Sequence, residues 1–206
     1  MKRRGKIILI VFISLVVLAG IIVPIIPFLI FTPAYGRPSL EFPIAEQFNV
    51  TRLGAYNTPD WGELGIFHNG IDLIINGPTE VISPCFGVVN RIWYNINPYT
   101  GDGEVAMIHV SIMINYRWSL KLVFEPWANT TEIREQQLAA IIVKAGDKVE
   151  PGDLIGTLLN NYEYPHLHYM VMYNGDDVCP YAYSSITAKN IFIEIAVRTN
   201  STISYP

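Results

Sequence analysis

Two short histidine-containing segments, far apart in the chain, restrict the folds that this sequence can adopt. Three of the four histidines lie in the segments His68-Asn-Gly-Ile-Asp72 and His166-Leu-His168. Side chains on an extended strand alternate between its two faces, so His166 and His168 are expected to project to the same side. Imidazoles and a carboxylate gathered in this way are typical of a metal site, which requires a fold that brings the two segments together.

His68 and Asp72 are four residues apart, which imposes a bend on the backbone between them. On a straight strand roughly 13 Å would separate their side chains, whereas two donors share one ion at about 2 Å each. Asn69 and Gly70 lie between them, and both residue types tolerate turn geometry. Two imidazoles and one carboxylate match a zinc site whose fourth position is left for water or substrate, and this donor set favours zinc over calcium or magnesium.

The N-terminus combines a basic cluster with a long apolar run. Four basic residues precede residues 7–31, which contain no charged side chain. An apolar helix of roughly 20 residues crosses about 30 Å of hydrocarbon, so this run predicts an uncleaved transmembrane anchor. A secretory signal is the competing interpretation, with residues 34–36 as a cleavage site, but the apolar core of a signal is only about 7–15 residues long.

The basic cluster also predicts the side of the membrane on which the rest of the chain lies. Positive residues tend to stay in the cytoplasm, so residues 1–31 are expected to form a cytoplasmic flank and anchor, 32–43 a linker, and 44–206 one extracytoplasmic domain. Beyond the anchor, ten basic residues stand against eighteen acidic ones, a formal charge of −8. This balance argues against a nucleic-acid partner, which would need clustered Lys and Arg.

Cys85 and Cys179 are the only cysteines, and the sequence leaves their state open. In an oxidising exterior an even pair permits a disulfide, whereas two buried free thiols are the alternative. Neither has a second cysteine or histidine at ligand spacing. The Asn-x-Ser/Thr pattern of glycosylation occurs at three positions, all in the part expected outside the membrane: Asn49, Asn129 and Asn200.

After the linker, short runs rich in Val, Ile, Tyr and Trp alternate with Gly, Pro, Asn and Asp, which predicts a mostly β domain. One segment differs, because Thr130 or Thr131 could cap a helix over residues 132–140, which are largely good helix formers. The strands are expected at residues 70–75, 79–82, 87–94, 104–114, 118–124, 155–159, 168–173 and 191–197.

Four segments that follow one another carry a family resemblance. His68-x-x-x-Asp72 is followed by residues 81–89, then by residues 143–156 with the turns Gly-Asp-x-Val and Pro-Gly-Asp-x-Ile-Gly, and finally by Pro165-His-Leu-His168. In this set and order, over residues 48–183, the chain resembles the LytM/lysostaphin-type zinc metallopeptidases, many of which cleave peptide cross-links of bacterial cell walls. The resemblance implies a β-rich domain with a core of antiparallel sheet.

The same two turns occur in lipoyl and biotinyl carrier domains, which indicates a lipoyl-like hybrid core. A carrier function is rejected, because it needs a lysine at a hairpin tip and no lysine lies between Lys148 and Lys189.

By position, the resemblance implies that His68, Asp72 and His168 bind zinc and that His166 is a catalytic histidine beside the ion. Three ligands leave the ion open to a water molecule whose pKa it lowers, and a nearby imidazole can relay protons during attack on an amide. The implied activity is hydrolysis of peptide bonds in cell-envelope peptide or protein outside the cytoplasm.

One position departs from the family pattern. A histidine in a Tyr-Ala-His-Leu-like strand end is usual before the Gly-Asp-x-Val turn, but the counterpart here is Val123-Phe-Glu-Pro126. Glu125 stands about where that histidine would be and can act as a general base, although a merely solvated carboxylate is the alternative. Residues 160–164 also replace the family's Gly-rich loop. A second function therefore stays open, that of a non-catalytic LytM-like module that binds an envelope polymer or a partner protein.

Two further groups of residues have simpler structural interpretations. His109 lies within an apolar strand and is expected to be structural. Four aromatic residues could line a substrate groove, but aromatic side chains in a β domain mostly reflect strand packing: Trp127, Tyr162, Tyr164 and Tyr169.

Overall fold

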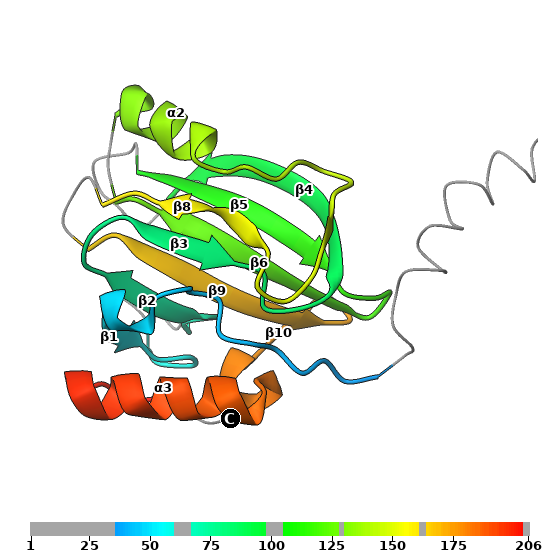
Figure 1. Cartoon of the computed structure of the whole chain (residues 1–206), viewed down its shortest axis with the longest axis vertical. Coiled ribbons are helices and arrows are strands. Elements are labelled where there is room, and N and C mark those ends of the chain that lie inside the picture. Colours follow the sequence, from blue (N-terminus) through cyan, green and yellow to red (C-terminus); the bar gives the residue numbers. More distant parts are fainter. Residues whose placement is uncertain (1–35, 60–66, 98–104, 128–129, 161–163, 204–206) are drawn as a thin grey trace, which may run out of the picture. The chain divides into compact units, whose positions relative to one another are not determined.

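The computed structural model describes residues 36–59, 67–97, 105–127, 130–160 and 164–203 (Figure 1). These residues form a mostly β domain, as the strand pattern predicts. The strands are β1 (Val50–Gly54), β2 (Ile71–Ile75), β3 (Thr79–Ile82), β4 (Gly87–Ile96), β5 (Ala106–Met113), β6 (Trp118–Glu125), β7 (Lys148–Val149), β8 (Leu154–Leu158), β9 (His166–Tyr173) and β10 (Asp176–Val178). The helices are η1 (Gln47–Asn49), α2 (Thr131–Ala139), η2 (Pro180–Tyr183) and α3 (Ile186–Thr199).

Seven strands follow one another in the large sheet in the order β1-β2-β9-β6-β5-β4-β7, and β10 pairs with β9. Every pairing between these strands is antiparallel. A separate two-stranded sheet joins β3 to β8. Figure 1 shows this small sheet lying against one face of the large sheet, with α3 running along the end that carries β1 and β10.

The core lies between the large sheet, the β3–β8 pair and α3. Alternate residues of the central strands are fully buried on this side, such as Ile108, Leu122 and Leu167. Because side chains alternate along a strand, the residues between them project from the opposite face. That opposite face carries His166 and His168.

The local signals for α2 and for the two turns are confirmed. Thr130 caps α2, since its hydroxyl accepts a hydrogen bond from the backbone N–H of Ile133 at 3.3 Å. In the turns, the carboxylate of Asp147 accepts from the backbone N–H of Lys144 at 2.9 Å, and Asp153 does the same for Glu150 at 2.8 Å. These aspartates are therefore explained by turn geometry.

The strand expected at residues 191–197 is wrong, because this segment belongs to α3. Ser185 begins the helix by accepting a hydrogen bond from the N–H of Ala188 at 3.0 Å. The buried side chains are those of Ala188, Phe192 and Ile195, three and four residues apart, which is the spacing of one helix face. The β-branched residues of this segment favoured a strand, but packing of that face against the core overrides their propensity.

The N-terminal expectations fall largely outside the described residues. The anchor over residues 1–31 and the first part of the linker are not described, and no helix within the described ranges is long and apolar enough to cross a membrane. Leu40 and Phe42, which belong to the stretch expected to be a linker, are buried in the core. Cys85 and Cys179 are both buried and are not joined by a disulfide in the part of the chain that the structure describes, which agrees with the second of the two alternatives for them.

His109 is a structural residue of the sheet, as expected. Its ring stacks on Trp93 with centroids 4.6 Å apart and an angle of 4° between the planes, and its Nε2 is hydrogen-bonded to Oδ1 of Asn95. Burial lowers the pKa of His109 from its usual 6.5 to about 4, and the positive charge of Lys121 adds to this effect.

The packing of α3 predicts different costs for two substitutions of the same residue type. Ile195 is fully buried, whereas Ile193 is 44% exposed on the other side of the helix. Ile195→Ala should lower the free energy of unfolding by about 2–5 kcal/mol, because it leaves a cavity in the core. Ile193→Ala should cost less than about 1 kcal/mol. Urea denaturation measures both, and equal costs would contradict the helical assignment of this face.

The lowered pKa of His109 predicts a pH dependence of stability. Between pH 6.5 and about 4, the unfolded chain binds a proton at this imidazole that the folded protein does not bind. Stability from this group is therefore fully present above pH 6.5 and is lost as the pH falls through this window. Glutamine does not titrate, so His109→Gln should lose less stability than the unaltered protein over this pH window. The difference in the free energy of unfolding should be on the order of 1–2 kcal/mol, after allowance for partial solvent exposure. The free energy of unfolding of both proteins, measured by urea denaturation at several pH values from 7 to 4, tests this prediction. The same pH dependence in both proteins would refute it.

Candidate metal centre

Antiparallel pairing of β2 with β9 places Asp72 directly opposite His168. On its other side, His168 is opposite Val123 of β6. Directly opposite residues in antiparallel strands share one face, so the Asp72 carboxylate and the His168 imidazole lie side by side. Nδ1 of His168 is 2.7 Å from Oδ1 of Asp72.

His68 reaches the same point from the segment that precedes β2. Its backbone is held by two hydrogen bonds, to the carbonyl of Thr58 and from the N–H of Asn57. The chain then bends at Gly70 before β2 begins, as the spacing of His68 and Asp72 requires. Nδ1 of His68 donates to the carbonyl of Ala55 at 2.8 Å, and this hydrogen bond turns Nε2 toward the centre.

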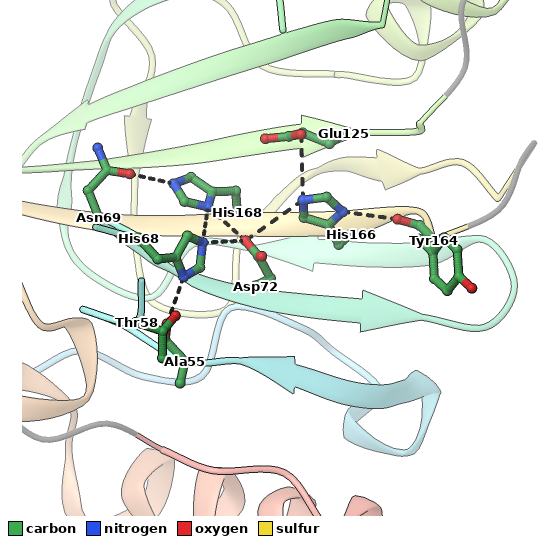
Figure 2. A network of polar contacts seen from close by, with 9 residues as sticks. All are labelled: Ala55, Thr58, His68, Asn69, Asp72, Glu125, Tyr164, His166 and His168. Carbon is green, nitrogen blue, oxygen red and sulfur yellow. Dashed lines mark hydrogen bonds and ion pairs between the residues drawn. The ribbon is translucent and has the colours of Figure 1, made fainter. Parts of the chain in front are cut away.

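The three donor atoms form a compact triangle (Figure 2). Nε2 of His68 lies 3.1 Å from Oδ1 of Asp72 and 3.1 Å from Nδ1 of His168. Zinc bonds of about 2.0–2.1 Å at tetrahedral angles place neighbouring donors about 3.3 Å apart. The spacing and chemistry of these three groups therefore fit three corners of a zinc tetrahedron, and the set can hold a metal ion.

Two glycines make space for these side chains. A Cβ at Gly54 would lie 2.7 Å from Oδ2 of Asp72, and a Cβ at Gly70 would lie 2.8 Å from the ring of His168. Both distances are shorter than a real Cβ contact. Gly70 is thus needed for the close approach of the imidazole, in addition to its place in the bend.

His166 and Glu125 form a second polar group beside the triangle (Figure 2). They are directly opposite each other on β9 and β6, and Nε2 of His166 is 3.5 Å from Oε2 of Glu125. The same Nε2 is 3.7 Å from Oδ1 of Asp72. Nδ1 of His166 donates to the carbonyl of Tyr164 at 3.0 Å, which turns Nε2 toward the two carboxylates. Glu125 is 4% exposed, so it is not a solvated surface carboxylate.

Burial and mutual charge shift the pKa values of these groups. Burial acts to raise the pKa of Asp72, but the charge of His166 and hydrogen bonds from the two other histidines outweigh it and hold that pKa well below its usual range. Burial raises the pKa of Glu125, and the neighbouring histidines offset only part of this rise. Burial acts to lower the pKa of His166, yet the carboxylates of Asp72 and Glu125 raise it above its usual value. The His166–Glu125 pair therefore retains a proton more firmly than either group would in water.

A cavity of about 290 Å³ opens beside this pair. Of the four aromatic residues considered from the sequence, Trp127 and Tyr164 line it, whereas Tyr169 is fully buried in the core and residue 162 is outside the described ranges. Among the residues that the structure describes, the lining consists of Arg52, Asp72, Ile74, Trp127, Tyr164 and His166.

Sequence reasoning missed several residues that shape the centre. Asn69 accepts a hydrogen bond from Nε2 of His168 at 3.1 Å, and this amide holds the ring so that Nδ1 faces the triangle. The carbonyl of Ala55 does the same for His68. The role of Asn69 in orienting His168 could have been predicted, because Asn69 lies within the first histidine motif. The roles of the Ala55 carbonyl and of the space at Gly54 could not, because no local sequence pattern indicates them.

Solved structures of several bacterial proteins are similar to this chain. The catalytic domain of the antimicrobial peptidase lysostaphin from Staphylococcus simulans is 22% identical, with a TM-score of 0.45, over 68% of this chain and 97% of that one. Csd3 from Helicobacter pylori is 19% identical, with a TM-score of 0.45, over 79% of this chain. The match covers 41% of the Csd3 chain, so this protein spans about two fifths of that length. A zinc-containing peptidase from Vibrio cholerae is 23% identical, with a TM-score of 0.41, over 71% of this chain and 39% of that one.

Among curated proteins, none matches this chain. The family comparison, in contrast, covers the part of the sequence that carries the donor triangle. Peptidase family M23 matches residues 66–180, which is more than half of the chain. The range begins just before His68 and ends after β10, and it includes Glu125 and both histidines of β9. Members of this family are zinc-dependent metallo-hydrolases. The expected resemblance to LytM/lysostaphin-type peptidases is thus confirmed, and the chain belongs to peptidase family M23.

Proposed function

We propose that this protein is a zinc metalloendopeptidase that hydrolyses peptide bonds in cell-envelope material. The observation that carries the proposal is the convergence of His68, Asp72 and His168, whose donor atoms all lie within 4.8 Å of one another. His166 and Glu125 stand directly beside them. Three ligands with two proton-transfer groups at their side are what metal-assisted amide hydrolysis requires.

Zinc would be held by Nε2 of His68, Oδ1 of Asp72 and Nδ1 of His168. When bound, it supplies a Lewis acid that polarises the amide carbonyl and lowers the pKa of water at the open position. The hydrogen bonds of the two imidazoles to Ala55 and Asn69 orient the rings for this role.

The remaining chemistry is assigned to Glu125 and His166. In the proposed reaction, Glu125 takes a proton from the water that attacks the amide carbon, and this proton then passes to the leaving amine as the C–N bond breaks. His166 donates a hydrogen bond through Nε2 toward the negative charge that develops on the carbonyl oxygen. Its bond to the carbonyl of Tyr164 fixes the ring for this purpose.

The location of this activity is also a proposal. The basic cluster and the apolar run of residues 7–31 support an uncleaved single-pass anchor with the N-terminus in the cytoplasm. Residues 44–206 would then act outside the membrane on peptide or protein of the envelope. The excess of acidic residues supports a partner other than nucleic acid.

A non-catalytic LytM-like module that binds an envelope polymer or a partner protein is the second candidate. It is favoured by Glu125 at the place of the family histidine and by the altered residues 160–164. The two candidates differ in the demand for metal. A zinc-free protein under metal-replete conditions would support the binding module, because a purely structural scaffold has no use for an open three-ligand site.

The ligand assignment predicts which variants lose zinc. The protein should bind one zinc ion, and His68→Ala and His168→Ala should each lose it at micromolar metal, since each removes one of three protein donors. His166→Ala should retain the metal but lose hydrolysis. His109→Gln serves as the control and should keep both. Metal analysis of the purified variants measures this, and full zinc occupancy in His68→Ala would defeat the assignment.

The role of Glu125 predicts a loss of rate without a loss of metal. Glu125→Gln keeps the shape of the side chain but cannot take a proton, so kcat should fall by about 10²–10⁴ while zinc content stays unchanged. Glu80→Gln, at an exposed position on β3, is the matched control and should leave kcat unaltered. A kcat for Glu125→Gln equal to that of the unaltered protein would show that another group is the base.

A further inference from the structure

The cavity beside the metal centre has a cationic side chain, that of Arg52, on one wall. Arg52 lies on β1 opposite Ile74, and Ile74 lies on β2 opposite His166. These three residues form a row across neighbouring strands, so their side chains share one face of the sheet. All three line the cavity of about 290 Å³.

An irregularity in β1 lies directly before Arg52. The register against β2 shifts between Val50 and Arg52, where Val50 is opposite Ile75 and Arg52 opposite Ile74. Such a bulge re-aims the side chains of a strand and is common beside active sites. Two residues further on, Gly54 leaves the space next to Asp72 open. The edge strand thus places one long cationic side chain at the cavity and a small residue at the metal centre.

The guanidinium of Arg52 is exposed and has no hydrogen bond or ion pair with any residue in the described ranges. Other arginines of the domain are engaged. Arg198 donates to the carbonyl of Val50 at 2.9 Å, and Arg37 donates to the carbonyl of Ala182 at 2.5 Å. A planar guanidinium with free N–H groups in a cavity is suited to bidentate binding of a carboxylate.

Two aromatic residues form other walls of the cavity. Trp127 and Tyr164 both have left-handed backbone conformations, with φ of 53° and 61°. This conformation is uncommon for bulky residues and marks positions that the surrounding structure holds against strain. The ring of Trp127 lies 5.5 Å from that of His166, and the backbone carbonyl of Tyr164 accepts the hydrogen bond from Nδ1 of the same histidine. Both residues of these walls therefore contact the proposed catalytic histidine.

We propose that this cavity is a substrate subsite in which Arg52 binds a carboxylate on the residue next to the scissile bond, with Trp127 and Tyr164 flanking its carbon chain. The inference rests on the proposed peptidase function and narrows its substrate class to peptides that carry such a group. The carboxylate is either the chain terminus or an acidic side chain. A peptide without a carboxylate at this position leaves the guanidinium without a partner and is therefore expected to bind less tightly.

The test uses zinc-loaded protein and matched peptide pairs. In one arm the peptides end in a free acid or an amide, and in the other a residue beside the scissile bond is Glu or Gln. The unaltered protein should cleave the carboxylate form of at least one pair with a higher kcat/KM. Arg52→Gln should lower that kcat/KM about ten- to hundred-fold and change the amide form less than about three-fold. Arg117→Gln, at an exposed turn position, is the control and should keep the preference.

Binding to the zinc-loaded Glu125→Gln protein, measured by calorimetry with the same pairs, separates this inference from the proposed function. If no peptide is cleaved but the carboxylate forms bind more tightly and lose this advantage in Arg52→Gln, the subsite stands and the peptidase function fails. If peptides are cleaved but Arg52→Gln affects both forms equally, the function stands and the subsite is overturned. A preference confined to one arm identifies the source of the carboxylate.

Discussion

The antiparallel register of β9 against its two neighbours is the constraint on which the rest of the site depends. It sets His168 opposite Asp72 on one side and His166 opposite Glu125 on the other. A slip of one residue would turn both histidines into the core and expose the residues between them. Leu167 is fully buried on the core face, so the apolar packing of that face fixes the register. The packing of the apolar face therefore determines the geometry of the polar face.

The same centre contains several ionisable groups that are buried from solvent. Asp72 and Glu125 are each 4% exposed and lie against three imidazoles. Buried charges are costly unless they are paired, and for Glu125 the pairing is incomplete, because burial raises the pKa of its carboxyl despite the neighbouring histidines. A divalent cation would neutralise both carboxylates at once, so metal binding and folding stability are coupled in the proposed enzyme. A polar cluster of this kind is an expected feature of the proposed metal-dependent function.

Two further groups of the proposed site lie around the donor triangle. Glu125 lies at the end of β6 and faces His166 at 3.5 Å. Arg52 lies on β1, before the region that matches the family. The donor triangle lies within the region that matches the family, whereas in the proposed function a neighbouring strand end and an edge strand determine how the base and the substrate are presented. This division follows the architecture, since the central strands are constrained by packing on both sides and the edge strand on one.

Much of the site was readable from the sequence because its donors lie in short motifs. The spacing of His166 and His168 on one strand, the bend between His68 and Asp72, the cap at Thr130 and the turn aspartates are all local properties, and residue type and spacing determine them. The sequence could not show that residues 191–197 form a helix, because their β-branched side chains favour a strand until a helical face is buried against the core. Nor could it show the row of Arg52, Ile74 and His166, which arises only when β1, β2 and β9 pair. Sequence alone determined which groups can bind a metal; the tertiary structure decided what surrounds them, because strand register and close approach at glycines depend on parts of the chain far apart.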